Sequence, residues 1–153
     1  MANPIKRIKE LQAISREHHH ALLLCWKIKT GFAKGISSQR MYTYAAWFYH
    51  HYLLPHFDIE EKYVFPILGN DDQDVLQALL EHQKLKDCFS GNQDQVLVLK
   101  EIQTLLENHI RFEERVLFNR IQEIANDSQW KSLQAHHKEH HFTENMEDEF
   151  WKS

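Results

Sequence analysis

The sequence predicts an all-α protein, an up-down-up-down four-helix bundle with a short extra helix at the C-terminal end. Three observations support this fold class. Only 4 glycines and 3 prolines occur in 153 residues, so long stretches of chain contain no helix-breaking residue. These stretches repeat apolar residues at helical spacing, and the breaks between them are short. Short connections between long helices favour antiparallel neighbours.

The breaks fall at residues 31–38, 69–72 and 90–94, where Gly, Asn, Asp and Ser gather. They predict four helices over residues 5–30, 38–68, 72–89 and 95–125, followed by a helical tail over residues 128–150. A chain of this length buries a core without disulfide support. We therefore expect one domain over residues 1–153, with the bundle at about 5–125.

Composition and charge exclude several classes of protein. The formal net charge is −4 and the Lys and Arg residues are scattered, which argues against a nucleic-acid-binding stripe. Cys25 and Cys88 are isolated and too few for a disulfide framework, which suits a reducing compartment. The first residues lack the apolar core of a secretory signal, and the apolar runs are too short to span a bilayer. We expect a soluble cytoplasmic protein that binds neither nucleic acid nor membrane.

One motif occurs twice, as HFDIEEKYVFPIL from His56 and as HIRFEERVLFNRI from His109. In both copies a glutamate, Glu60 or Glu113, follows the histidine by four residues. On a helix the two side chains then project from nearly the same stripe, which is a spacing that metal ligands use. An amphipathic helix with charged residues would explain one copy. Two aligned copies favour a metal site.

Heptad patterns place one histidine on the apolar seam of each predicted helix. The four seam histidines are His18, His56, His82 and His109, whereas His19 and His20 are turned away. The same patterns place Tyr52, Ile59, Tyr63 and Val116 on the seam. A single seam histidine is more often a satisfied core residue. Four of them, joined by both motif glutamates, would leave many buried polar groups unpaired at about 1 to 3 kcal/mol each, and a bound cation removes this cost.

The number and type of these side chains indicate which metals they suit. Four imidazoles and two carboxylates exceed what one zinc ion takes, and two carboxylates able to bridge suggest a dinuclear centre. Mixed nitrogen and oxygen ligation points to iron or manganese. Ferritin-like di-iron proteins use Glu-x-x-His helices and more carboxylate, whereas this set is richer in histidine.

The ordered set of EHHHAL around His18, HFDIEEKYVFP from His56, LEHQKL around His82 and HIRFEERVLF from His109 resembles the hemerythrin-like, or HHE cation-binding, domain family. The resemblance extends to about residue 125 and implies a bundle of hemerythrin type around two iron ions joined by an oxo or hydroxo bridge. It implies that His18 and His56 bind one iron, that His82 and His109 bind the other, and that Glu60 and Glu113 are shared.

Members of this family bind oxygen, nitric oxide or iron, and serve as carriers, sensors or stress-response proteins. The resemblance therefore implies a non-haem di-iron binding protein whose partner is a small diatomic ligand or iron. The alternative is a di-iron enzyme with peroxidase or ferroxidase activity, so whether the protein is an enzyme stays open.

Two positions depart from the respiratory members of the family. Lys86 stands where they carry a second histidine on the third helix, and an ammonium group cannot ligate. The loss leaves each iron an open position, which suits sensing, nitric oxide capture or peroxide chemistry better than oxygen carriage. Their last carboxylate lies five residues after its histidine. Here a spacing of four turns a helix by about 40° and a spacing of five by about 140°, which favours Glu113 over Glu114 as the ligand.

Three further features keep two interpretations each. Glu61 and Glu114 are rival ligands, or solvated charges that pair with a neighbouring helix, which is the preferred reading. In the tail QAHHKEHHF, His136 and His140, and His137 and His141, are each one turn apart. They bind zinc or copper, or belong to a polar fifth helix, which is preferred because no carboxylate or thiol completes a site. Pro55 kinks the helix and re-aims His56, or is tolerated for packing.

Overall fold

The computed structural model describes residues 6–139 and 141–153, and in this part of the chain every regular element is a helix. The α-helices are α1 (Lys9–Ala33), α2 (Ser38–Phe48), α3 (Leu54–Ile59), α4 (Gln73–Cys88), α5 (Gln95–Phe112), α6 (Phe118–Ile124) and α7 (Asp127–His136). Three π-helical turns, η1 (Tyr49–Leu53), η2 (Glu60–Val64) and η4 (Glu113–Leu117), and two 3₁₀ turns, η3 (Phe65–Ile67) and η5 (Phe150–Lys152), complete the set. The predicted all-α class is confirmed.

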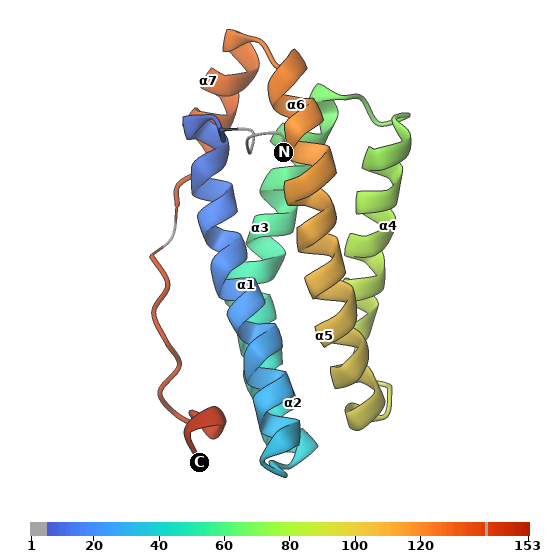
Figure 1. Ribbon diagram of the computed structural model, residues 1–153, viewed down its shortest axis with the longest axis vertical. Helices are drawn as coiled ribbons and strands as arrows, with labels where there is room; N and C mark the ends of the chain where they lie inside the picture. The colour runs from blue at the N-terminus through green and yellow to red at the C-terminus, as the bar shows by residue number, and fades with distance from the viewer. Residues whose placement is uncertain (1–5, 140) are drawn as a thin grey trace, which may run out of the picture.

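Four rods lie side by side, and each runs opposite to the one before it (Figure 1). They are α1, the continuous helix from α2 to η3, α4, and the continuous helix from α5 to α6. Polar side chains cap the joints: Ser37 accepts from the Arg40 amide before α2, Asp72 accepts from the Asp74 and Val75 amides before α4, and Asp94 accepts from the Leu97 amide before α5. The predicted breaks therefore fall at real helix ends, within a few residues.

The first helix differs most from its predicted bounds. Its expected start at Ile5 lies outside the described residues, and the helix is regular from Lys9. It also continues through Gly31 to Ala33, where the sequence predicted a break. A Cβ atom at Gly31 would stand 2.4 Å from Met41 Sδ and 2.9 Å from a ring carbon of Phe150. This glycine therefore permits close packing inside a helix and does not end it.

The three π-helical turns explain why part of the heptad prediction was wrong. Each adds a residue to one turn, so the buried face moves forward by one position. Beyond η1 and within η4 the buried residues are Leu53, Glu60, Val64 and Leu117, in place of the predicted Tyr52, Ile59, Tyr63 and Val116. The first of these turns directly precedes Pro55, which has no amide proton to donate. The rod thus accommodates the proline by a π turn.

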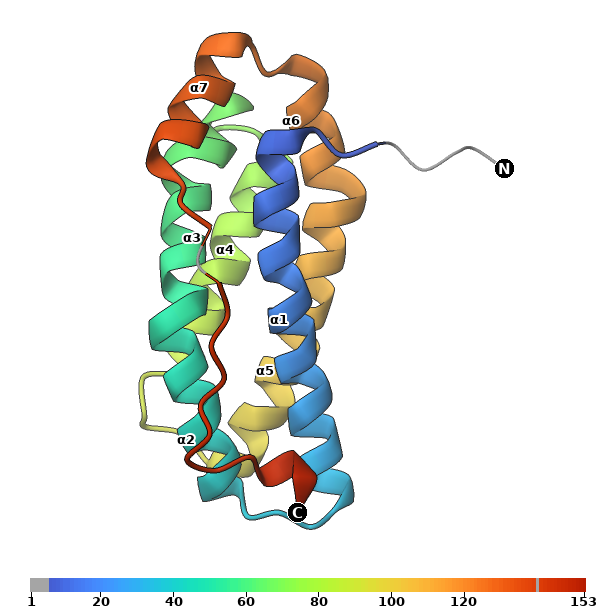
Figure 2. The same ribbon diagram turned by 90° about the vertical axis from the view of Figure 1, so that its left-hand side faces the viewer.

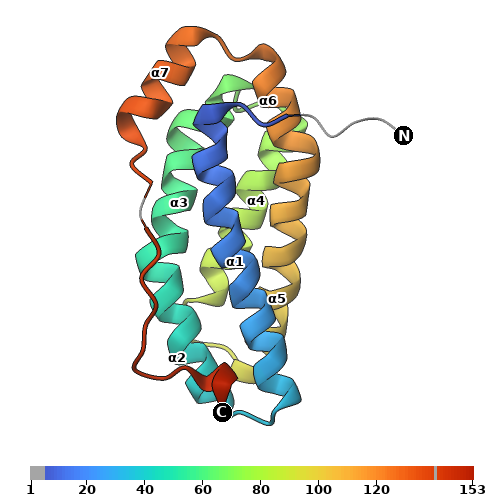
Figure 3. The same ribbon diagram turned by 60° about the vertical axis from the view of Figure 1, so that its left-hand side comes forward.

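The tail is helical only as far as His136, so the predicted helix over residues 128–150 is wrong for its second half. Asn126 and Gln129 form a capping box that starts α7, and the chain then runs back along the bundle over α1 and the α2–α3 rod as an extended strap (Figures 2 and 3). We call residues 137–149 the strap, of which residue 140 lies outside the described part.

A buried ion pair fixes the strap to the bundle. The Lys27 ammonium on α1 is 2.7 Å from both the Tyr44 hydroxyl and Glu144 Oε2, and it lies 4.1 Å from the centre of the Trp151 ring. The Tyr44 hydroxyl also donates to Glu144. These contacts hold the extended strap against α1 and α2.

The core consists of two apolar clusters stacked along the bundle. The lower cluster joins α1, α2 and α5 around Leu24, Phe48 and Ile102, and the upper cluster joins α1, α4 and α6 around Leu11, Val75 and Phe118. On α1 and α4 the seam histidine lies between the two clusters in sequence, and on the other two rods it lies at the end of the lower cluster, directly before Phe57 or Ile110. Within the described residues, no helix is long and apolar enough to cross a membrane.

Candidate metal centre

Six ionisable side chains occupy the space between the two apolar clusters. His18 comes from α1, His56 from α3, His82 from α4 and His109 from α5, while Glu60 and Glu113 are the first residues of η2 and η4. Each histidine is at most 6% exposed, and both glutamates are fully buried. All six residues that the sequence singled out as ligands are therefore brought together in the interior.

The six side chains fall into two overlapping groups that could each hold a metal ion. One group is Glu60, His82, His109 and Glu113, and the other is His18, His56 and Glu60, with the ligating atoms of each group within 4.8 Å of one another. Glu60 belongs to both groups. His82 Nε2 and His56 Nε2 each lie 3.3 Å from Glu60 Oε1, and His18 Nε2 lies 3.8 Å from Glu60 Oε2.

The second shared carboxylate is Glu113, which also faces both pairs of histidines. It contacts His109 Nε2 directly, and its Oε1 lies 3.9 Å from His18 Nε2 and 4.0 Å from His82 Nε2. The two carboxylates thus stand between the His18–His56 pair and the His82–His109 pair. Such a position allows a carboxylate to bridge two cations.

The outer nitrogen of every ring is held by a different carboxylate. Nδ1 of His18 is 3.1 Å from Glu114, Nδ1 of His56 is 2.8 Å from Glu17, Nδ1 of His82 is 2.7 Å from Glu61, and Nδ1 of His109 is 2.7 Å from Glu81. A carboxylate on Nδ1 fixes the ring orientation and directs the Nε2 lone pair inward, as in metal-ligating histidines generally. The fold therefore presents four oriented nitrogen donors.

Glu17 and Glu81 were missed by the sequence argument, although a signal was present. Each stands directly before a ligand histidine, as Glu17-His18 on α1 and Glu81-His82 on α4. In both cases the histidine faces the centre and the glutamate orients the histidine of the next rod. The repeated Glu-His pair matches the repeated His-x-x-x-Glu-Glu motif, and the two repeats together give the site an approximate two-fold symmetry.

The rival ligands and the neighbouring histidines take other roles. The structure places Glu61 and Glu114 on the outer nitrogens of His82 and His18, away from the centre. Lys86 Nζ lies 3.4 Å from Glu61, so this lysine supports an orienting carboxylate. His19 is exposed, and His20 stacks on Phe142 of the strap at 4.4 Å.

The tail histidines form no second cluster among the described residues. His136 Nδ1 contacts the Ser132 carbonyl and its ring stacks on Tyr63, whereas His137 Nε2 is 3.1 Å from Glu17. His141 is exposed, and His140 lies outside the described residues. The strap instead reaches the centre indirectly, because His137 and His56 share the carboxylate of Glu17.

Burial and charge oppose each other at the four rings. Burial would lower the pKa of His18, but the carboxylates of Glu114 and Glu60 raise it to about 9. Burial acts the same way on His82, where Glu113, Glu60 and Glu61 raise the pKa to about 10. Burial would raise the pKa of Glu17, yet hydrogen bonds to His137 and His56 lower it to about 2. The pocket therefore stabilises positive charge at its centre.

The central atoms have no partner of their own. Among the described residues, Nε2 of all four histidines and both oxygens of Glu60 and Glu113 are buried without a hydrogen bond. Apart from the direct contact between His109 and Glu113, the nitrogens and oxygens that approach one another across the centre lie about 3 to 4 Å apart. Unpartnered buried groups of this kind are rare in folded proteins. Divalent cations fit this donor set, since they satisfy nitrogen and carboxylate lone pairs together.

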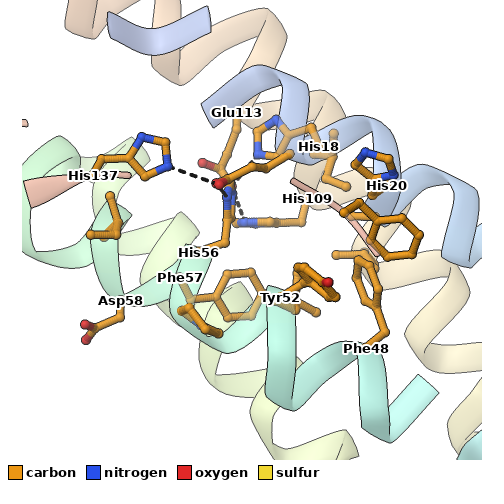
Figure 4. Close-up of a pocket in the computed structure, with 18 of the residues that line it drawn as sticks. His18, His20, Phe48, Tyr52, His56, Phe57, Asp58, His109, Glu113 and His137 are labelled. Carbon is orange, nitrogen blue, oxygen red and sulfur yellow. Dashed lines mark hydrogen bonds and ion pairs between the residues drawn. The ribbon is translucent and has the colours of Figure 1, made fainter. Parts of the chain in front are cut away.

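A cavity of about 330 Å³ opens beside the centre (Figure 4). Four central residues line it, namely His18, His56, His109 and Glu113. Apolar residues such as Phe48, Leu53 and Phe57 also line it, together with the polar side chains of Asp58 and Lys138. His137, Lys138 and Phe142 of the strap close its outer end. The centre is thus connected to a space much larger than the ions themselves need.

Comparison of the chain with models of protein families, with curated proteins and with solved structures finds no match. The structure by itself therefore shows an all-helical protein with a buried His/Glu cluster that could bind metal.

Proposed function

We propose that this protein is a non-haem di-iron protein of the hemerythrin-like type, which binds dioxygen, nitric oxide or iron for sensing, storage or protection. One observation carries the proposal. Eight buried donor atoms on four rods converge without partners, while a carboxylate holds the outer nitrogen of each ring. A cluster built only for stability would not leave its central atoms unpaired.

Two ions suit the site better than one. Each group of ligands supplies two imidazoles, and Glu60 and Glu113 stand between the groups. Six carboxylates face four imidazoles in all, so neutral rings leave an excess of negative charge, most of which two divalent cations would offset. Mixed imidazole and carboxylate ligation is typical of iron and manganese. When bound, iron supplies reversible binding of diatomic ligands and one-electron chemistry.

The family proposal rests on the order of the motifs along the four rods. His18, His56 with Glu60, His82, and His109 with Glu113 follow one another in the order that the hemerythrin-like family uses, and the rods alternate in direction as that fold requires. Lys86 supports Glu61 and does not face the centre. This arrangement favours open metal positions and so favours sensing or capture over oxygen carriage.

The first experiment is metal analysis followed by visible spectroscopy. We expect about two irons per chain after anaerobic loading with ferrous iron. Admission of oxygen should produce a coloured band, and its fate on degassing separates the two readings. A band that fades reversibly supports a binding protein, and a band that persists supports oxidation of the irons. Less than one ion per chain with iron, manganese or zinc would refute the metal-centre proposal.

A second candidate is a di-iron enzyme that reduces peroxide or oxidises ferrous iron. The cavity favours it, because it gives a reactant a route to the centre at His18, His56 and His109. Turnover of peroxide with a reductant, compared with an equal amount of free iron, tests this candidate. A rate no higher than that of free iron excludes it.

A further inference from the structure

The centre has an approximate two-fold symmetry, and a comparison of its two halves explains where the cavity lies. In one half, the ring of Phe57 stacks on His82 at 3.9 Å, and Phe65 lies on the same imidazole at 5.3 Å. Phe57 directly follows the motif histidine His56. The stacked phenyl ring covers His82, which does not line the cavity.

The other half lacks one of these two rings. Phe118 stacks on His18 at 5.5 Å, and the tilted ring of Phe65 lies at a similar distance from His82. The residue that follows the second motif histidine, His109, is Ile110, and its aliphatic side chain lines the cavity together with His18. The cavity therefore occupies the place that an aromatic ring takes in the opposite half.

We propose that this cavity binds a small aromatic molecule, a single ring carrying a hydroxyl group, such as a simple phenol. The ring would stack on His18 as Phe57 stacks on His82. This inference rests on the proposed function, because it places an organic ligand beside the metal centre. The cavity itself is formed by side chains of the protein and does not require the metal.

Size and lining agree with this class of ligand. An apolar cavity of about 150 Å³ is enough to hold a benzene ring, and this cavity measures about 330 Å³. Its walls include Phe48, Leu53 and Leu106, which give an aromatic ring apolar contact. A dioxygen molecule, which is smaller than benzene, would leave most of this space empty.

The position of the polar groups favours a hydroxyl on the ring. His18 Nε2 lies 3.9 Å from Glu113 Oε1, and both oxygens of Glu113 are buried without a hydrogen-bond partner. A hydroxyl group on a ring stacked against His18 therefore has an acceptor within reach, or a metal ion when the site is loaded.

The strap supplies an aromatic entrance. Phe142 stacks on His20 at 4.4 Å and lies 5.0 Å from the ring of Tyr52, and all three line the cavity. Aromatic side chains at the outer end give a ring-shaped ligand favourable contacts on its way in.

The test uses 4-fluorophenol as the probe and fluorine NMR as the readout, on the full-length protein with and without metal. We expect a saturable shift of the fluorine resonance in the metal-free protein, which unlabelled phenol reverses. Fluorobenzene should bind more weakly, because it lacks the hydroxyl. The metal-free measurement does not depend on the proposed function, so failure of iron to bind and failure of the cavity to bind are separate results.

The decisive variant is Ile110→Phe, which supplies the missing ring. Overpacking of this kind costs about 1 to 3 kcal/mol, so 4-fluorophenol should bind at least about tenfold more weakly, a factor that corresponds to about 1.4 kcal/mol. Leu105→Phe on the same helix is the matched control, since Leu105 does not line the cavity. If Ile110→Phe does not fold, Ala21→Met fills the same cavity from α1, with Ala13→Met as its control.

Three results would overturn the inference. They are the absence of a saturable shift in a folded protein, with or without metal, equal binding by the wild type and by a folded cavity-filling variant, and a shift that unlabelled phenol does not reverse. Retention of iron by Ile110→Phe at the wild-type level, with loss of the phenol shift, would assign the effect to the cavity alone.

Discussion

The two halves of the centre have the same types of donor side chain and different surroundings. His18 and His56 both line the cavity, whereas in the other half only His109 lines it and His82 lies under the stacked ring of Phe57. Every ring has its own carboxylate in both halves. The repeat in the sequence thus fixes the donors, while single residues outside the repeat decide which donors a ligand can reach.

The carboxylates behind the rings also differ between the halves. Glu17, which orients His56, is held by His137 of the strap, whereas Glu81, which orients His109, is held by Gln77 on its own helix. The first half is therefore tied to the tail of the chain and the second is not. A nearly symmetric set of donor side chains can therefore contact the C-terminal strap on one side only.

Removal of a ligand should have the largest effect. His56→Ala and His109→Ala should each lower the metal content to about half or less, because each removes an oriented donor from one ion. His19→Ala is the matched control, since His19 is exposed. Metal analysis after identical loading measures the effect, and an equal loss in all three variants would contradict the assignment of the ligands.

Removal of an orienting carboxylate should have the next largest effect. Glu17→Gln and Glu81→Gln occupy matching positions, and each should weaken metal binding by about 10- to 100-fold, as is usual for groups behind a metal ligand. Glu101→Gln on the exposed side of α5 is the control. Competition with a chelator gives the affinity. Wild-type affinity in both variants would show that the rings need no carboxylate.

The stacked ring can be removed to make the halves alike. Phe57→Ile places the same residue type at both matching positions, and we expect a loss of unfolding free energy of about 1 to 2 kcal/mol, less than the roughly 3 to 5 of a truncation to alanine. Denaturant unfolding measures it. Xenon or a fluorinated aromatic probe should then find a second cavity, against His82, and a single bound probe would show that the core has collapsed instead.

The contact between the strap and the site predicts a smaller and one-sided effect. His137→Gln should lower metal affinity by less than about tenfold, because it loosens Glu17 and leaves Glu17 itself in place. The control is His136→Gln, whose ring contacts Ser132 and Tyr63 and not Glu17. Stepwise metal titration should show the change in one of two binding events. Equal changes in both events would mean that the strap acts on the whole bundle.

The stability of the metal-free protein should depend on pH through His18 in one half and His82 in the other, over slightly different pH ranges. The folded pKa of about 9 for His18 and about 10 for His82 exceeds the ordinary value of 6.5, so the stability from these charged rings is complete below pH 6.5. It is lost as pH rises through 9 and then 10. Thermal unfolding of the metal-free protein should therefore show a falling Tm over this range, and a Tm that rises with pH would reverse the sign.

The affinity for metal should depend on the same two histidines, but it should rise with pH where the stability of the metal-free protein falls. At pH 7 both rings carry a proton in the metal-free protein, and a metal ion must displace it. Affinity should therefore increase with pH, and calorimetry in buffers of different ionisation enthalpy should detect released protons.

The sequence by itself determined the helical class, the joints and the six central side chains. Those features depend on local patterns: glycines and capping residues at helix ends, and histidines at fixed spacing from glutamates on one helical stripe. The choice of Glu113 over Glu114 followed from the angle per residue alone, and the structure places Glu113 fully buried at the centre. Whether the six side chains bind metal stays a prediction.

Only the tertiary structure decided which atoms stand behind and beside the ligands. The π-helical turns moved the buried face by one residue. Around Pro55, Glu60 and Glu113 the backbone hydrogen bonds depart from the regular α-helical repeat, on which the heptad pattern depends. Glu17 and Glu81 acquired their roles from the neighbouring rods, and the extended strap contacts Lys27 and Tyr44 through Glu144. Contacts between residues about 100 positions apart have no local signature, so only the folded chain reveals them.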